Sequence, residues 1–148
     1  IDMSTSISIA SDHGGYELKS FLMHHFSSIS FIDLGTSSTD SVHYPTFADA
    51  LCNHILNQKS EKGILICGTG IGISMRANRY PGIRAAVVHS EFTASMAKAH
   101  NNANVLCLGE RTTTTDDAII YINAWLSTEF EGDRHQTRID MLDAPIQR

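Results

Sequence analysis

The sequence predicts one α/β domain, a doubly wound three-layer sandwich with a Rossmann-like five-stranded parallel sheet and an extra helix at the C-terminus. Five short, almost continuously apolar segments occur along the 148 residues, which is typical of parallel strands buried on both faces. Amphipathic segments with helical periodicity separate them, so each connection can be a right-handed crossover. The length and the hydrophobic fraction of 42% suit a single globular domain.

The five strands are expected at residues 7–10, 30–34, 64–67, 83–88 and 104–108. Apolar residues predominate in each of them, and polar residues follow at their carboxyl ends. Parallel strands end at the same edge of a sheet, so these polar residues are expected along one rim, where such folds bind ligands. Cys107 lies within the last strand and Cys52 on the apolar face of a predicted helix, so we expect both to be inert buried thiols.

Helices are expected at residues 16–27, 47–58, 74–79, 91–100 and 116–127, with a polar C-terminal helix from about Arg134. In the second of these, Phe47, Leu51 and Ile55 recur at helical spacing and define an apolar face. The fifth follows a run of threonines, and Thr115 or Asp116 is expected to be its N-cap.

Composition and charge exclude several classes of function. The net charge of −5 argues against a nucleic-acid partner. No apolar run approaches the length of a membrane span and no signal peptide is recognisable, so no membrane partner is expected. Three cysteines without close spacing favour a reducing compartment, and we expect a cytoplasmic protein. Residues 3–148 are taken as the domain, with Ile1 and Asp2, ahead of Met3, interpreted as a remnant of cloning.

The most informative motif spans residues 63–72, where a buried strand ends in Cys67. The loop that follows consists of Gly68, Thr69, Gly70, Ile71 and Gly72. A glycine turn at a helix N-terminus leaves N–H groups free to bind an anion, and the helix dipole there favours a thiolate. A plain strand-to-helix connection is the alternative, but three alternating glycines exceed what a turn needs. Since the spacing matches neither a dinucleotide fingerprint nor a P-loop, we expect a nucleophile or base beside an anion hole.

Polar side chains follow the other strands at the same edge of the predicted sheet. Asp12 and His13 follow the first strand, and Arg111 follows the fifth. His100 and Asn101 close the helix after the fourth strand, and we expect them on the same rim. Each also has an ordinary structural interpretation: Asp12 can cap a helix, and His100 can lie at a helix C-terminus because of the dipole.

Arg134 and Arg138 are four residues apart and therefore share one face of the C-terminal helix. Such a pair is usually a solvated surface pattern, but it can clamp a phosphate if the helix reaches a rim. The spacing leaves open whether that rim belongs to the same chain or to a second subunit. No metal site is expected, because no pair among His13, His89 and His100 has the spacing of helical ligands.

A series of motifs in fixed order extends these observations over nearly the whole chain. They are Ser11-Asp12-His13-Gly14-Gly15 with Leu18-Lys19, Tyr44-Pro45-x-Phe47-Ala48, the run of residues 63–74, Ala77-Asn78-Arg79, Gly82-Ile83-Arg84-Ala85-Ala86, His100-Asn101-x-Ala103-Asn104-Val105, Gly109-x-Arg111 and Arg134-His135-x-x-Arg138. In these motifs the chain resembles the ribose-5-phosphate isomerases of the B type, in the family that also includes the galactose-6-phosphate isomerase subunits. One position departs from the pattern, since His43 stands where relatives usually have aspartate.

The resemblance implies a role for each matching residue. Cys67 corresponds to the base that moves a proton between C1 and C2 of the open-chain sugar, and residues 68–72 to the loop that holds the enediolate oxygens. His100 corresponds to the residue that opens the furanose ring, with Asn101 beside it, and Asp12 to a contact of the sugar hydroxyls. The phosphate-binding set corresponds to His13, Arg111, Arg134 and Arg138. No metal or redox cofactor is implied, because the proton moves between adjacent carbons.

The resemblance also implies a homodimer, or a dimer of dimers, in which the C-terminal arginines reach a neighbouring subunit's site. The expected substrates are D-ribose 5-phosphate and D-ribulose 5-phosphate, interconverted through an enediolate in the pentose phosphate pathway. A six-carbon sugar phosphate such as allose or galactose 6-phosphate is the nearest alternative. A non-catalytic phosphosugar-binding protein would have no use for Cys67 and His100 together, and a nucleotide-binding module lacks its fingerprint.

Overall fold

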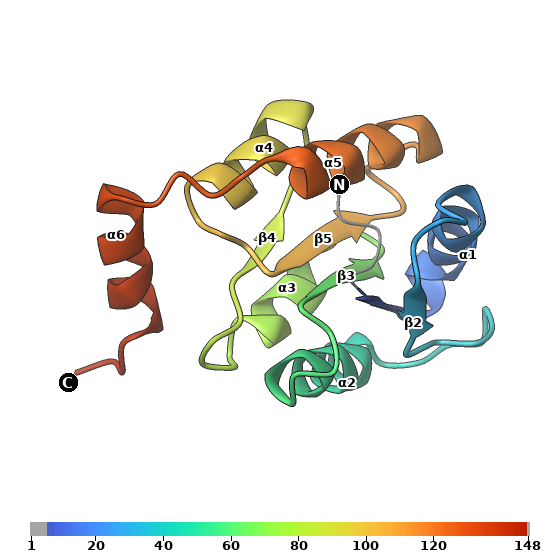
Figure 1. The fold of residues 1–148 in the computed structure, drawn as a ribbon. Coiled ribbons are helices and arrows are strands. Elements are labelled where there is room, and N and C mark those ends of the chain that lie inside the picture. Colours follow the sequence, from blue (N-terminus) through green and yellow to red (C-terminus); the bar gives the residue numbers. More distant parts are fainter. Residues whose placement is uncertain (1–5, 148) are drawn as a thin grey trace.

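The structure, a computed structural model, describes residues 6–147, so the interpretation of Ile1, Asp2 and Met3 lies outside the described residues. Its strands are β1 (Ile7–Ser11), β2 (Phe31–Asp33), β3 (Lys62–Cys67), β4 (Ala85–Val87) and β5 (Val105–Gly109). Its helices are α1 (Tyr16–His25), α2 (Tyr44–Leu56), α3 (Ile71–Ala77), α4 (Glu91–Ala99), α5 (Thr115–Ser127) and α6 (Arg134–Asp143), with the short 3-10 helix η1 (His13–Gly15) before α1 (Figure 1). Between residues 6 and 147, no helix is both long enough and apolar enough to cross a bilayer.

The five strands form one parallel sheet in the order β2-β1-β3-β5-β4, which confirms the predicted α/β sandwich. Ser11 of β1 pairs with Ile66 of β3, and Cys67 of β3 pairs with Gly109 of β5, so three strand ends meet at one edge. β2 lies on one side of β1, whereas β3, β5 and β4 lie on the other side, so the direction in which strands are added reverses between β1 and β3. Such a reversal opens a crevice between the two strand ends, where folds of this class bind ligands.

Helices cover both faces of the sheet (Figure 1). α1, α4 and α5 pack on one face, and α2 and α3 on the other. Side chains along β3 alternate between the two cores: Ile64 and Ile66 belong to the first, and Leu65 and Cys67 to the second. Cys67 therefore points toward the face that α2 and α3 cover.

Two helices begin earlier than the periodicity predicts. α2 begins at Tyr44 and not at Phe47, because Pro45 suits the first turn of a helix, where an N–H has no helical partner. α3 begins at Ile71, so the end of the glycine run is already helical. The amides that the loop presents therefore lie directly at the start of a helix.

The N-cap of α5 is Thr114, so the predicted caps Thr115 and Asp116 are wrong. The Thr114 hydroxyl accepts a hydrogen bond of 3.1 Å from the N–H of Asp117. A run of four threonines offers several candidate caps, and only the backbone geometry selects among them.

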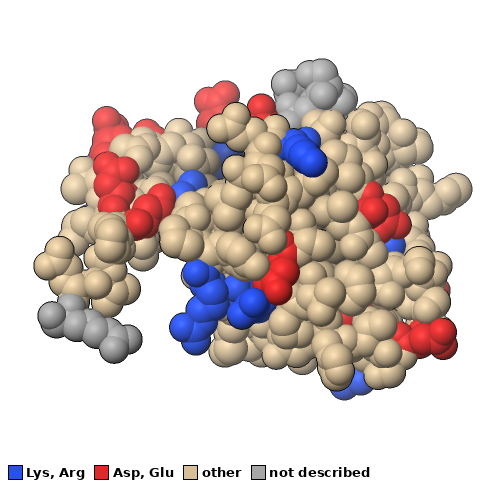
Figure 2. Space-filling model, turned by 90° about the horizontal axis from the view of Figure 1, so that it is seen from below, with Lys and Arg blue, Asp and Glu red and all other residues tan. Residues whose placement is uncertain are grey.

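The expected extra helix, α6, stands apart from the body of the domain (Figure 1). His135 and Ile139 are its buried residues, whereas Met141 and Leu142 are 73% and 63% exposed. Figure 2, seen from below, shows the C-terminal segment as an arm at the left, with a hollow between it and the body. Basic side chains gather on the body side of this hollow.

Candidate active site

Cys67 lies at the carboxyl end of β3 and is 5% exposed. The N–H of Gly70 donates a hydrogen bond to its sulfur, with 3.1 Å between nitrogen and sulfur. The helix α3 begins directly after Gly70, so the sulfur lies among backbone amides at the start of this helix.

Packing explains two of the three alternating glycines. Gly70 has a φ of 79°, in the left-handed region, and a Cβ there would lie 2.9 Å from the backbone of β5. At Gly72 a Cβ would come within 2.7 Å of the ring of Tyr44. Gly68 has more room, because its Cβ would make ordinary contacts of 3.6 Å with the side chain of Arg111. Gly70 and Gly72 therefore have an ordinary structural reason, so their presence does not by itself indicate an anion site.

The end of β1 lies directly against this loop. Asp12 is buried, and its Oδ1 accepts a hydrogen bond of 3.0 Å from the N–H of Gly14. A Cβ on Gly14 would lie 3.4 Å from the backbone nitrogen of Gly68, so the two strand ends approach closely. The Nδ1 of His13 accepts a hydrogen bond of 3.1 Å from the N–H of Val42, which assigns the proton of the neutral ring to Nε2. His13 can therefore donate to an anion.

Arg111 comes from the turn after β5. Its N–H donates to the carbonyl of Gly68 at 2.9 Å, and the N–H of Glu110 donates to the carbonyl of Cys67 at 3.0 Å. The carboxylate of Glu110 accepts the N–H of Leu18 at 2.7 Å and thereby caps the first turn of α1. The structure thus brings five predicted parts of the site to the carboxyl edge of the sheet, namely Asp12, His13, Cys67, the loop of residues 68–72 and Arg111.

His100 and Asn101 lie at the opposite edge of the sheet in the same chain. α4 begins after the carboxyl end of β4 and runs back, so its C-terminus reaches the amino edge. His100 ends α4, and soon after it the carbonyl of Asn104 accepts the N–H of Gly63 at the start of β3. A strand as long as β5 spans about 16 Å. The expectation that His100 and Asn101 share the rim of Cys67 within one chain is therefore wrong.

Arg134 and Arg138 are exposed on α6, which lies beside this amino edge (Figure 1). The segment that leads to α6 is attached to the end of α4, since the N–H of Glu131 donates to the carbonyl of Ala99 at 3.0 Å. The spacing left open whether the C-terminal helix reaches the rim of its own chain, and in this structure it does not. The two arginines are on the side of His100, away from Cys67.

A group that sequence spacing did not reveal lies at the same edge. The imidazoles of His100 and His135 stack with centroids 4.1 Å apart and planes 12° from parallel. The carboxylate of Glu131 lies 3.7 Å from the Nε2 of His100 and 3.4 Å from that of His135. The four-residue spacing of Glu131 and His135 is the signal that could have indicated part of this group.

The same three residues raise the question of a metal, because their ligand atoms lie within 4.8 Å of one another. Parallel stacked rings direct their lone pairs side by side, whereas tetrahedral coordination needs lone pairs that converge on one point. The geometry therefore favours a histidine pair that shares one carboxylate over a metal site.

Acidification is expected to destabilise the fold through His135. Burial lowers the pKa of His135, the charges of His100, Arg134 and Arg138 lower it further, and Glu131 opposes them. The unfolded chain then binds the proton more readily, so the free energy of unfolding should fall as the pH drops below about 6.5. The decrease in melting temperature between about pH 8 and pH 5 should be smaller in His135→Gln than in the wild type.

The matched control is His24→Gln, which replaces an exposed histidine of α1. This variant should keep the wild-type dependence of melting temperature on pH. If His135→Gln also keeps it, His135 does not couple protonation to folding.

The other two cysteines match the prediction of inert thiols. Burial raises the pKa of Cys52 in α2 to about 12 and raises the pKa of Cys107 in β5 well above its usual value. At neutral pH both stay protonated, and both lie inside the core. Cys67 is therefore the cysteine placed for chemistry.

Known proteins share this sequence and this fold. The model of the ribose/galactose isomerase family matches residues 7–142. A putative sugar phosphate isomerase of Rickettsia bellii is 47% identical over 135 residues, which cover 90% of this chain and 94% of the relative. The structure of ribose-5-phosphate isomerase B from Clostridium thermocellum matches with a TM-score of 0.92 at 43% identity, over 93% of this chain and 95% of that one. The ribose-5-phosphate isomerase B of Mycoplasma genitalium, solved with bound ribulose-5-phosphate, matches with a TM-score of 0.90 at 43% identity, over 95% of both chains.

Proposed function

The chain belongs to the ribose/galactose isomerase family and is a sugar-phosphate isomerase, and we propose that it interconverts D-ribose 5-phosphate and D-ribulose 5-phosphate. The observation that carries the proposal is the buried thiol of Cys67, which accepts the N–H of Gly70 at the sheet edge where Asp12 and His13 also lie. Support for a five-carbon substrate comes from the relative that was solved with ribulose-5-phosphate.

Isomerisation moves a proton between two adjacent carbons of the open-chain sugar. The Cys67 thiolate takes the proton from C2 of the aldose, and the electron pair of that bond forms the C1–C2 double bond while O1 becomes negative. The thiol then returns the proton to C1, and O2 becomes the ketone oxygen as its own proton passes to O1. Oxidation at C2 balances reduction at C1, so no external electron acceptor takes part.

The loop of residues 68–72 is proposed to stabilise the enediolate. Charge develops on O1 and O2 in the transition state, and preorganised N–H donors in a crevice lower its energy. The N–H of Gly70 is directed at the Cys67 sulfur and that of Ile71 at the Thr69 hydroxyl, so we propose that the remaining loop amides bind the oxygens. The buried carboxylate of Asp12 is placed to accept a hydroxyl of the sugar.

The rest of the site is proposed to come from a second copy of the chain. His100 and Asn101, for ring opening, lie at the amino edge, about a strand length from Cys67 in the same chain. A homodimer, alone or within a tetramer, completes the site if the amino edge of one chain faces the carboxyl edge of the other. The phosphate is then held by His13 and Arg111 of one copy with Arg134 and Arg138 of the other.

Activity on ribose 5-phosphate tests the proposal directly. The purified protein should produce ribulose 5-phosphate in the presence of EDTA, because proton transfer between adjacent carbons needs no metal. Proton NMR follows both sugars in one sample. If the protein binds the sugar phosphate but converts none of it, the proposal is wrong and the chain acts as a binding protein.

The substrate is expected to have five carbons. kcat/KM for ribose 5-phosphate should exceed that for allose 6-phosphate by about tenfold or more, because one extra carbon shifts the phosphate relative to the reacting carbons. Steady-state kinetics on both sugars measure the ratio. A preference for allose 6-phosphate would assign the protein to six-carbon substrates instead.

A further inference from the structure

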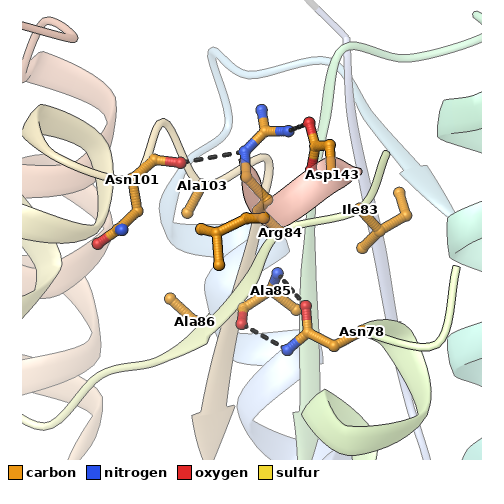
Figure 3. A pocket seen from close by; sticks show the side chains of 9 residues that line it. Asn78, Ile83, Arg84, Ala85, Ala86, Asn101, Ala103 and Asp143 are labelled. Atoms are coloured by element: carbon orange, nitrogen blue, oxygen red, sulfur yellow. Dashed lines mark hydrogen bonds and ion pairs between the residues drawn. The ribbon is translucent and has the colours of Figure 1, made fainter. Parts of the chain in front are cut away.

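Arg84 lies just before β4, at the amino edge, on the wall of a pocket of about 400 Å³. Its side chain is 18% exposed and makes three polar contacts. Nε donates to the carbonyl of Asn101 at 3.0 Å, Nη2 to the carbonyl of Asn102 at 3.1 Å, and Nη1 to Oδ2 of Asp143 at 2.8 Å. Figure 3 shows the guanidinium between Asn101 and Asp143. One planar group therefore joins the loop after α4 to the end of α6.

The first two contacts hold the loop that follows α4, since Asn101 and Asn102 come directly after the C-cap of that helix, His100. The C-terminal end of a helix carries partial negative charge, so a guanidinium beside it is favourable. Asn102 turns the chain in the left-handed region, with a φ of 43°. The backbone of Arg84 holds the same loop, since its N–H donates to Oδ1 of Asn104 at 2.8 Å and its carbonyl accepts the N–H of Asn104 at 3.2 Å. These bonds hold the backbone of the loop that begins directly after His100.

The third contact fastens α6. Asp143 is the last residue of this helix, whose first half is attached near the end of α4 through His135. Its ion pair with Arg84 is partly shielded, with side-chain exposures of 18% for Arg84 and 35% for Asp143, and charge-assisted bonds of this kind are strong. This contact is therefore a second attachment, at the far end of the helix that carries Arg134 and Arg138.

We propose that Arg84 is a positioning residue of the isomerase, whose guanidinium orients His100 through the loop carbonyls and aligns the arginines of α6 through Asp143. The inference rests on the proposed function, because that function assigns ring opening to His100 and phosphate binding to α6. Lysine cannot replace arginine here, since three partners in different directions need a planar fork of donors and an ammonium is a point charge. A charged residue before a strand reveals nothing of its partners, so the sequence alone assigns Arg84 no role.

Two assays separate ring opening from proton transfer. Ribose 5-phosphate forms a furanose ring, so its conversion needs ring opening before the proton can move. Ribulose 5-phosphate cannot close such a ring, because its O5 carries the phosphate. Exchange of its C1 proton with deuterium from the solvent therefore requires the Cys67 step alone.

In Arg84→Lys, kcat for ribose 5-phosphate is expected to fall about tenfold or more, because a small displacement of His100 is costly. At saturating ribulose 5-phosphate, exchange at C1 should stay within about twofold of the wild type, since Cys67 is unaffected. Asp143→Ala releases only α6, so it should raise KM for both sugars about fivefold with little change in kcat. Arg79→Lys, in an exposed arginine on the wall of a neighbouring pocket, is the matched control and should change neither reaction.

Two results would overturn the proposal. A parallel loss of both reactions in Arg84→Lys indicates a general loss of structure, and unchanged conversion of ribose 5-phosphate indicates no role at all. A wild-type protein that converts neither sugar contradicts the proposed function instead, so the two failures are distinguishable.

Discussion

Cys67→Ala is expected to lower kcat for ribose 5-phosphate by about 10³-fold or more, because it removes the group that we propose takes the C2 proton. The thiol is 5% exposed and sits below the loop, so its loss removes little binding surface and KM should change little. Steady-state kinetics and deuterium incorporation at C2 measure both effects. Cys67→Ser should be almost equally inactive. Its hydroxyl can still accept the N–H of Gly70, but a hydroxyl is too weak an acid to supply an anionic base at neutral pH.

The matched control for this prediction is Cys52→Ala. Cys52 is also fully buried beside the same core, so its replacement tests the effect of removing a thiol as such. We expect kcat close to that of the wild type and a lower melting temperature, since a small cavity is left in the core. Near-normal turnover in Cys67→Ala would remove this residue from the mechanism.

Mixing two inactive variants is expected to restore activity if the site is shared between subunits. Cys67→Ala and His100→Ala, unfolded together and refolded as an equal mixture, should recover about one quarter of the wild-type activity. About half of the dimers are then mixed, and each mixed dimer has one site of two in which Cys67 and His100 are both present. Each variant alone should remain inactive.

The control for subunit mixing is expected to lower activity, whereas the first mixture raises it. A chain with both substitutions leaves no intact site in a mixed dimer with the wild type, so it should reduce the activity of the wild type by about half on refolding together. If Cys67 and His100 act within one chain, the first mixture stays inactive and the second keeps its full activity. Either of these outcomes would contradict the shared site.

The crevice around Cys67 illustrates what sequence patterns predict well. β3 is a continuous apolar run, and strands of one parallel sheet end at one edge. Asp12 follows β1, Cys67 ends β3 and Arg111 comes two residues after β5, so their meeting at that edge depends only on strand direction and pairing. The sequence could not predict why Gly70 and Gly72 must be glycine, because the atoms that a Cβ would meet there belong to β5 and α2.

The other half of the proposed site shows where sequence patterns fail. His100 follows a helix, and the far end of a crossover helix lies at the edge opposite to the one where it begins. Arg84 carries no local signal, because its partners lie in other segments of the chain. The spacing of Glu131 indicates its contact with His135 but not the one with His100. For the same reason the sequence shows no spacing of metal ligands, although the fold brings two histidines and a carboxylate together.

By itself, the sequence determined the alternation of strands and helices and the position of Cys67 and its glycine loop at the carboxyl edge. These follow from periodicity and strand direction, which are set by residues close together in the chain. Only the tertiary structure decided that His100 and α6 lie at the amino edge, and that Arg84 joins them. Those positions depend on contacts between segments far apart in the chain, which no local pattern encodes.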